Sequence, residues 1–285
     1  MSARSVLAAL KPEKYQITQI GITHEGKWLS GDNVLDAMLN GQEKSLLPAA
    51  LLGDPTQKGL KVIRSSGQNQ VLEHLADLDV VFPVLHGTFG EDGTIQGLLE
   101  MADLAYVGAG VLGSSLGMDK SVFKDVMRIH NIPVLESILV LRREIAEDIE
   151  TVIARAERVA PYPLFVKPAN LGSSVGVTKC RSRSDLMEGL MEAARYDRRA
   201  LVERGVNGRE IEISILGNDQ PQASIPGEII PSGDFYTYAA KYLDDKSQLL
   251  IPAPISSETT AQVKDIALRA IWPATAPGWP GLTFC

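Results

Sequence analysis

A lysine followed by a loop of small residues is the part of this chain best suited to bind an anion. Residues 164–177 read LFVKPANLGSSVGV, so Lys167 ends an apolar run and Gly172, Ser173 and Ser174 follow it. Small residues let backbone N–H groups approach an anion closely, and the lysine adds a positive charge. We therefore expect a strand–loop–strand hairpin that binds phosphate. It is not a P-loop, because no lysine follows the glycines as that motif requires. The alternative is a plain hairpin with a surface lysine.

A second polar stretch, residues 86–97 (HGTFGEDGTIQG), follows the apolar run 80–85 (VVFPVL). We expect the run to form a strand that is buried on both faces. His86 and the acidic pair after it then lie at the carboxyl end of a central strand, where open α/β sheets bind their ligands. The simpler alternatives are that Glu91 and Asp92 cap a helix beginning near Thr94, and that His86 is a lone histidine at a strand end.

Residues 108–113 match the dinucleotide-binding pattern GxGxxG after a predicted strand, residues 105–107. That motif also needs an acidic residue that closes a second strand about 20 residues further on. Residues 121–130 instead have helical apolar spacing, which places Asp125 within a helix. This context argues against a nicotinamide dehydrogenase. Lys120 directly precedes the predicted helix, and by itself it is a solvated residue at a helix start.

Acidic and basic side chains continue towards the C-terminus. A predicted strand ends at Glu203, whose carboxylate can accept hydrogen bonds from an amine or a ribose hydroxyl. Glu210 and Glu212 alternate onto one face of the next strand, which is either solvated or faces a nucleotide. An aromatic stretch then leads to Lys241 and Tyr242.

Helices and strands must position these residues. The spacing of apolar residues along the chain predicts where these elements lie. We expect helices over residues 5–10, 145–159, 184–196 and 261–270, and further strands over 15–23, 137–140, 200–203 and 210–216, with a hairpin turn at 26–28. Strands and helices alternate along the chain, which indicates an α/β fold.

The composition excludes several classes of protein. The 285 residues contain 28 Lys and Arg against 35 Asp and Glu, a net charge of −7, so no global field attracts nucleic acid or an anionic membrane. No apolar run approaches the roughly 20 residues of a membrane span. Cys180 and Cys285 are the only cysteines, which implies neither a disulfide framework nor a zinc site. We expect a cytoplasmic protein.

Taken together, the motifs resemble the D-alanine–D-alanine ligase family of the ATP-grasp superfamily, from Ser2 to Ala270. The matching segments, in family order and spacing, are residues 86–97, 118–120 (MDK), 166–168 (VKP), 172–176 (GSSVG), 209–212 (REIE) and 235–242 (FYTYAAKY). The resemblance implies an ATP-grasp fold: a Rossmann-like α/β domain (1–108) lacking its first strand, a central subdomain (109–203) and an incomplete C-terminal subdomain (204–285). Such proteins use ATP to join two D-alanines through an acyl phosphate, in peptidoglycan precursor synthesis.

The resemblance also implies roles for individual residues. Those implied to bind ATP are Lys120, Lys167, Gly172, Ser174, Glu203, Val206, Glu210 and Lys241. Ser173 and Tyr242 are implied to orient the first D-alanine, and His86 to lie beside it. Tyr242 favours the dipeptide over D-alanyl-D-lactate as product, although a D-lactate-type ligase stays an alternative. Family members are usually homodimers.

The two ends of the chain depart from the family pattern. The family opens with a strand and a glycine-rich turn, whereas this sequence starts at the following predicted helix. After Ala270 the family has an arginine, an aspartate, and later a glutamate and an asparagine that hold Mg²⁺, and none of these follows here. The codons for residues 271–285 permit GLARVDFL in a shifted frame, so we expect a frameshift near Ala270. Without magnesium ligands, the chain as written is expected to be poorly soluble or inactive. A catalytically dead fragment that keeps part of the nucleotide site is a further alternative.

Overall fold

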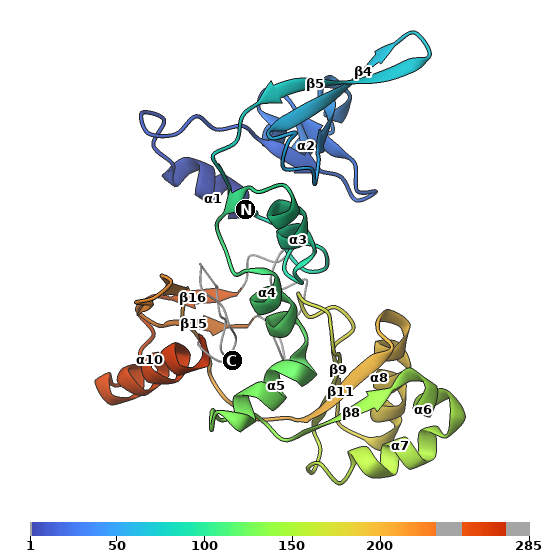
Figure 1. Ribbon diagram of the computed structural model, residues 1–285. Coiled ribbons are helices and arrows are strands. Elements are labelled where there is room, and N and C mark those ends of the chain that lie inside the picture. The colour runs from blue at the N-terminus through green and yellow to red at the C-terminus, as the bar shows by residue number, and fades with distance from the viewer. Residues whose placement is uncertain (1, 232–246, 272–285) are drawn as a thin grey trace. The chain divides into compact units, whose positions relative to one another are not determined.

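The computed structural model describes residues 2–231 and 247–271 (Figure 1). Two compact units divide the chain, the first made of residues 1–84 and 96–107 and the second of 85–95 and 108–285. The three-part division expected from the sequence stays a prediction. Within the described ranges, no helix has the length and apolar character needed to cross a membrane.

The first unit is mainly an antiparallel sheet. Its elements are α1 (Ser2–Ala9), β1 (Ile20–Ile22), β2 (Trp28–Ser30), α2 (Val34–Leu39), the 3-10 helix η1 (Glu43–Ser45), β3 (Leu47–Leu51), β4 (Leu60–Ser66), β5 (Asn69–Ala76), β6 (Val80–Val81), α3 (Thr94–Met101) and β7 (Ala105–Tyr106). Strands β1 to β5 pair in sequence order, and all these pairs are antiparallel. The predicted turn at 26–28 joins β1 to β2, with Gly26 at φ 82°. The strand expected over 15–23 is shorter, because only β1 pairs.

A parallel pair follows this antiparallel sheet. Strand β6 pairs with β7, and α3 lies between them in the chain, as in the βαβ units of Rossmann-like domains. The prediction of a strand buried on both faces over 80–85 was wrong, since only Val80 and Val81 pair and Val80 is 51% exposed. In the part of the chain that is described, β6 pairs with β7 alone, and Pro83 has no N–H to extend the ladder.

The second unit contains the remaining elements. They are α4 (Val111–Met118), α5 (Lys120–Ile129), β8 (Ser137–Leu141), α6 (Arg142–Glu147), α7 (Ile149–Ala156), β9 (Leu164–Pro168), β10 (Thr178–Cys180), α8 (Arg183–Tyr196), β11 (Arg199–Arg204), β12 (Glu210–Glu212), β13 (Ile215–Leu216), β14 (Gln222–Ala223), β15 (Gly227–Ile230), β16 (Gln248–Leu250) and α10 (Ser257–Ile271). The helix expected over 145–159 divides at Asp148, whose carboxylate accepts a hydrogen bond from the Thr151 N–H (3.1 Å) and starts α7. The strand expected over 210–216 also divides, because β12 and β13 pair in different sheets.

An antiparallel sheet in the order β10-β9-β11-β8 forms the base of the second unit. Helices α6, α7 and α8 lie along this sheet in Figure 1, and their apolar side chains share one core with the strands. Its fully buried members include Val140, Ile153, Leu164, Val166, Leu186, Leu190 and Val202. Burial of each such side chain contributes roughly 1.5–3 kcal/mol, so the strands that carry Lys167 and Glu203 have a rigid support.

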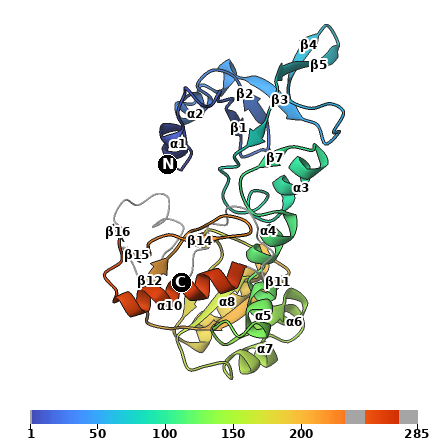
Figure 2. The ribbon, with the colours of Figure 1, turned by 60° about the vertical axis from the view of Figure 1, so that its left-hand side comes forward.

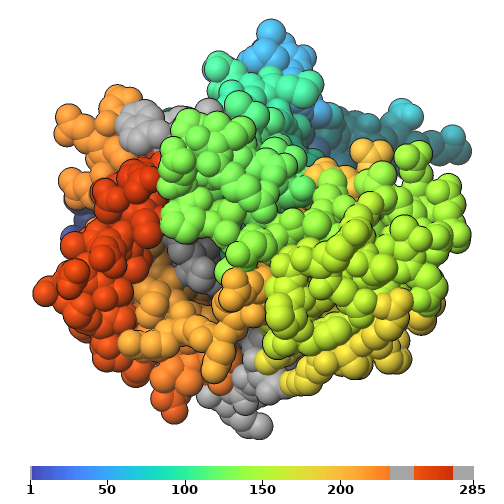
Figure 3. Space-filling view, turned by 90° about the horizontal axis from the view of Figure 1, so that it is seen from below, coloured from blue at the N-terminus to red at the C-terminus, as the bar shows by residue number. Residues whose placement is uncertain are grey.

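Helix α10 packs against two other parts of the same unit. Figures 2 and 3 show one of these contacts, in which the red helix α10 lies beside the green segment that contains α5. Ala270 shares a core with Met127 of α5 and with Ile132. Ala267 and Ile271, in turn, pack with buried isoleucines around β13. The helix predicted over 261–270 is therefore confirmed, and it holds α5 in place through α5's apolar face.

Cys180 provides a test of the hairpin core. Its thiol is fully buried, and burial raises its pKa to about 12. Because the thiolate is the reactive form, we expect Cys180 to resist Ellman's reagent at pH 8 in the folded Cys285→Ser protein and to react at once in guanidinium. Stoichiometric labelling of the native protein within minutes contradicts this packing.

Candidate functional site

The hairpin of β9 and β10 carries the loop that the sequence singles out. Val166 lies opposite Thr178 in its antiparallel register, so the strand–loop–strand prediction is confirmed. The second strand begins at Thr178 rather than at Val175. Ser173 and Ser174 both have left-handed backbone conformations, at φ 55° and 57°. Each non-glycine residue in this region costs about 1–3 kcal/mol, and such strain is concentrated at functional sites.

Both polar stretches noted in the sequence meet at Gly172. A Cβ on Gly172 would lie 3.4 Å from the Cα of Gly87 and 3.6 Å from the Glu91 Oε2. The same Glu91 oxygen accepts a hydrogen bond from the Gly87 N–H (2.6 Å). The loop that begins at His86 therefore packs against the small-residue loop, at distances that leave room for little more than a Cβ at position 172.

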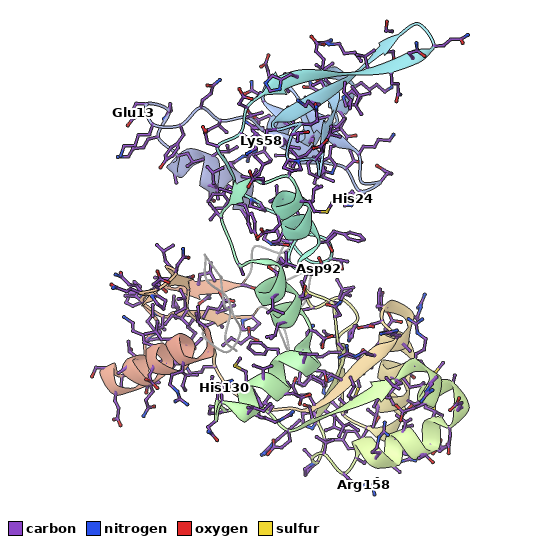
Figure 4. The ribbon with its side chains drawn as sticks, viewed as in Figure 1. Glu13, His24, Lys58, Asp92, His130 and Arg158 are labelled. Carbon is purple, nitrogen blue, oxygen red and sulfur yellow. The ribbon has the colours of Figure 1, made fainter. Side chains whose placement is uncertain are left out.

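Asp92 shapes the loop after His86. Its carboxylate accepts hydrogen bonds from the N–H groups of Phe89 (2.9 Å) and Thr94 (3.0 Å), the latter at the start of α3. Burial opposes ionisation, yet these hydrogen bonds outweigh it and lower the pKa of Asp92. The Ser115 hydroxyl donates to the Asp92 carbonyl (2.8 Å), which links the loop to α4. Asp92 is labelled in Figure 4. The predicted bond from Asp92 to the start of α3 is confirmed, so Asp92 has a structural role, whereas Glu91 accepts from Gly87 instead.

Lys120, at the first position of α5, lies beside the start of the hairpin loop. Its N–H donates to the carbonyl of Ala169 (2.9 Å), and its Nζ donates to the carbonyls of Leu171 and Pro168. Burial, together with repulsion from Lys167, lowers its pKa to about 8. The two lysines predicted to bind phosphate are thus close enough to repel one another.

An ion pair that the sequence analysis missed fixes the start of α5. Asp119 caps the helix by accepting from the N–H groups of Ser121 (3.2 Å) and Val122 (3.1 Å). Its two oxygens also accept from the Arg199 guanidinium, at 2.7 and 2.9 Å. The carbonyl of Arg199 accepts from the Ala169 N–H (2.9 Å), so helix, strand and loop are joined at one point. Nothing in the sequence distinguishes Arg199 from neighbouring surface arginines.

Glu203 is the buried carboxylate of the site, only 4% exposed. One of its oxygens accepts from Lys124 on α5 and the other from Lys167 on β9. Burial raises the pKa of Glu203, but the two ammonium groups outweigh this effect and the pKa is lowered. For Lys124, burial dominates and lowers the pKa. Lys124 was not predicted, although its position four residues after Lys120 puts it on the same helix face.

The other predicted residues are placed as follows. Val206 lies just after β11 and is 55% exposed. Glu210 and Glu212 both belong to β12, where Glu210 pairs with Ile229 of β15. Lys241 and Tyr242 lie outside the described residues. Within the described ranges, no group of three or more His, Cys, Asp and Glu residues is arranged to hold a metal ion.

Comparisons with known proteins agree with this arrangement. The model of the D-ala D-ala ligase N-terminus matches residues 1–109, and that of the D-ala D-ala ligase C-terminus matches residues 126–280. The D-alanine–D-alanine ligase of Natranaerobius thermophilus is 44% identical over 270 residues, which cover 94% of this chain and 72% of that protein.

Two solved structures are similar over 98% of this chain. The VanG D-Ala:D-Ser ligase of Enterococcus faecalis has a TM-score of 0.82 and 30% identity, with 78% of that chain covered. The D-alanine–D-alanine ligase of Coxiella burnetii has a TM-score of 0.77 and 33% identity, with 73% covered. The fold and the lysine-lined hairpin therefore define an ATP-grasp enzyme. The sequence matches place it further: the chain belongs to the D-alanine–D-alanine ligase family.

The Asp119 ion pair predicts a clear stability difference between two positions on α5. Asp119→Ala removes a helix cap and leaves the partly buried Arg199 without its carboxylate, so we expect a loss of about 2–4 kcal/mol in the free energy of unfolding. Asp125→Ala is the control, because its pair with Arg128 (2.7 Å) is exposed and contributes less than about 1 kcal/mol. Urea unfolding followed by circular dichroism measures both, and equal losses contradict the prediction.

Proposed function

We propose that this chain binds ATP at the β9–β10 hairpin and joins two D-alanines through an acyl phosphate. The observation that carries the proposal is the group of three lysines, at positions 120, 124 and 167, around one buried carboxylate, Glu203. Lys120 also interacts with Asp119 and Asp197, and Arg199 pairs with Asp119, so four cations stand against three carboxylates. An excess of positive charge thus remains beside a loop of small residues, which suits a polyphosphate. Family membership supports ATP and D-alanine as the substrates.

In the proposed reaction, a carboxylate oxygen of the first D-alanine attacks the terminal phosphate, which releases ADP and leaves an acyl phosphate. The amine of the second D-alanine then attacks the acyl carbon and displaces phosphate. Negative charge spreads over the phosphoryl oxygens during transfer, so positioned cations supply most of the stabilisation. Lys120 and Lys167 provide two of these cations, and the N–H groups from Gly172 to Ser174 cover the phosphates.

The remaining roles follow the family resemblance and are proposals. Glu203 and Val206 bind the adenine, Glu210 the ribose, and Lys241 the transferred phosphate. Ser173 and Tyr242 orient the first D-alanine, with His86 beside it. Magnesium is expected for the family, but none of the described residues forms a suitable cluster, so we assign no magnesium ligand among them. We also propose that the protein forms a homodimer in the cytoplasm. Its product would be used for peptidoglycan precursor synthesis.

The proposed function is tested by titrating the purified chain with ATP and then supplying ATP, MgCl₂ and either D-alanine or L-alanine. We expect saturable ATP binding. ADP and D-alanyl-D-alanine that form together only when D-alanine is supplied support ligation, whereas ATP binding without either product overturns the ligation part of the proposal. A folded chain that does not bind ATP overturns the proposal.

A second candidate product is suggested by the VanG D-Ala:D-Ser ligase, the structural neighbour with a TM-score of 0.82. The name of that protein pairs D-alanine with D-serine, so we include D-serine as a candidate substrate here. Competition between D-alanine, D-serine and D-lactate, with the products separated by chromatography, decides between them. We expect the D-alanyl-D-alanine dipeptide to dominate.

ATP binding should depend on pH through Lys120. Because the pKa of Lys120 in the free protein is about 8, the group is half deprotonated at that pH and must regain a proton beside a phosphate. We expect uptake of roughly half a proton per ATP at pH 8, and weaker binding as the pH rises through 8. Calorimetry in buffers of different ionisation enthalpy measures this uptake. Lys120→Arg should abolish it, since a guanidinium does not titrate there.

Gly176 should control the conformation of the loop. It has φ 68°, and a Cβ there would lie 2.7 Å from the Tyr196 ring and 2.8 Å from the Pro168 ring. Gly176→Ala must therefore displace the loop, and we expect at least a tenfold loss of ATP affinity. The control is Gly117→Ala in α4, where a Cβ meets nothing within 4 Å. The prediction fails if the two variants bind ATP equally well.

A further inference from the structure

The two lysines that neutralise Glu203 differ in their surroundings. The Lys124 side chain is 11% exposed, and its Nζ also donates to the carbonyl of Leu135 (3.2 Å). By contrast, the Lys167 side chain is 27% exposed and lies over the Phe165 ring, with its Nζ 5.7 Å from the ring centroid. Lys124 is therefore enclosed and held by two oxygens, whereas Lys167 is accessible from the solvent.

Lys167 is repelled by both of the other lysines. Its charge contributes to the lowered pKa of Lys124 and to that of Lys120, which lies on the side of the hairpin loop. An anion bound between Lys120 and Lys167 removes the repulsion between these two groups. Lys124 extends from the second turn of α5 towards Glu203 and Leu135, so its charge faces the carboxylate.

The carboxylate limits how Lys167 can move. An ionised carboxylate that is buried without a counter-ion is strongly destabilising. If Lys167 alone neutralised Glu203, binding a phosphate with Lys167 would compete with this pairing. A second counter-ion that stays in place removes the competition.

We propose that Lys124 is a positioning residue that remains paired with Glu203 and thereby frees Lys167 to bind the phosphates of ATP. This inference rests on the proposed function, because it assumes that Lys167 binds ATP. It assigns a role to Lys124, a residue to which the family resemblance gave none. Lys124 acts through Glu203, since its other hydrogen bond among the described residues goes to the backbone carbonyl of Leu135.

A purely structural role makes different predictions. If Lys124 only links α5 to β11, its removal weakens the whole site, and ligands with and without phosphates lose affinity together. If it frees Lys167, its removal affects ligands with phosphates selectively. Neutralising Glu203 should then suppress the effect, because a neutral glutamine no longer holds Lys167.

The experiment measures ATP and adenosine affinities by displacement of a fluorescent ATP analogue, for the full chain and four variants. For Lys124→Met we expect at least a tenfold weaker ATP affinity with less than a threefold change for adenosine. Adding Lys124→Met to Glu203→Gln should change the ATP affinity less than threefold. Lys58→Met is the control, because it breaks the exposed pair with Asp103 (2.6 Å) and should change neither affinity.

Two results overturn the inference. One is that Lys124→Met lowers the affinities for ATP and adenosine equally. The other is a further tenfold loss of ATP affinity when Lys124→Met is added to Glu203→Gln. If Lys124→Met does not fold, the comparison of the double variant with Glu203→Gln still decides, since neither holds a buried carboxylate at position 203. Failure of the unmodified, folded chain to bind ATP is a separate result that refutes the proposed function itself.

Discussion

The site depends on one buried negative charge. Glu203 lies on the central strand β11 and pairs with ammonium groups from α5 and β9, so a helix and two strands are joined through a single carboxylate. A carboxylate at 4% exposure is stable only when it is paired and hydrogen-bonded. The pairing lets the protein hold three lysines close together without a bound anion. Repulsion within the group is therefore partly compensated before any nucleotide arrives.

Apolar packing beneath the sheet keeps this charge network in place. Strands β9 and β11 pair directly, with Lys167 opposite Leu201 and Phe165 opposite Glu203. On one face of β9, Leu164 and Val166 are buried against the helices. Because side chains alternate along a strand, Phe165 and Lys167 lie on the other face. The same register therefore serves the core and the site, and a shift by one residue would exchange the two faces.

Local patterns made most elements predictable, but not their partners. The hairpin, α5, α8 and α10 were predicted because each depends on apolar spacing and turn residues within a short stretch. The apolar run 80–85 was misjudged, because burial of a strand depends on neighbours that hydrophobicity alone does not reveal. Lys124 and Arg199 were missed because their acidic partners are 79 and 80 residues away in the chain. Only the folded chain brings such groups together.

Ala169 has a consequence for how the hairpin loop can move. Its N–H bonds to Arg199 and its carbonyl accepts from the N–H of Lys120, while its side chain is completely buried. The first residue of the loop is thus clamped between a strand and a helix, and the next N–H, that of Asn170, is held by Asp197 (2.8 Å). Any opening of the loop must hinge beyond Asn170, so its travel is limited to the few residues that reach Gly176. The part of the hairpin loop that can move is therefore short, because its first two residues are held by hydrogen bonds.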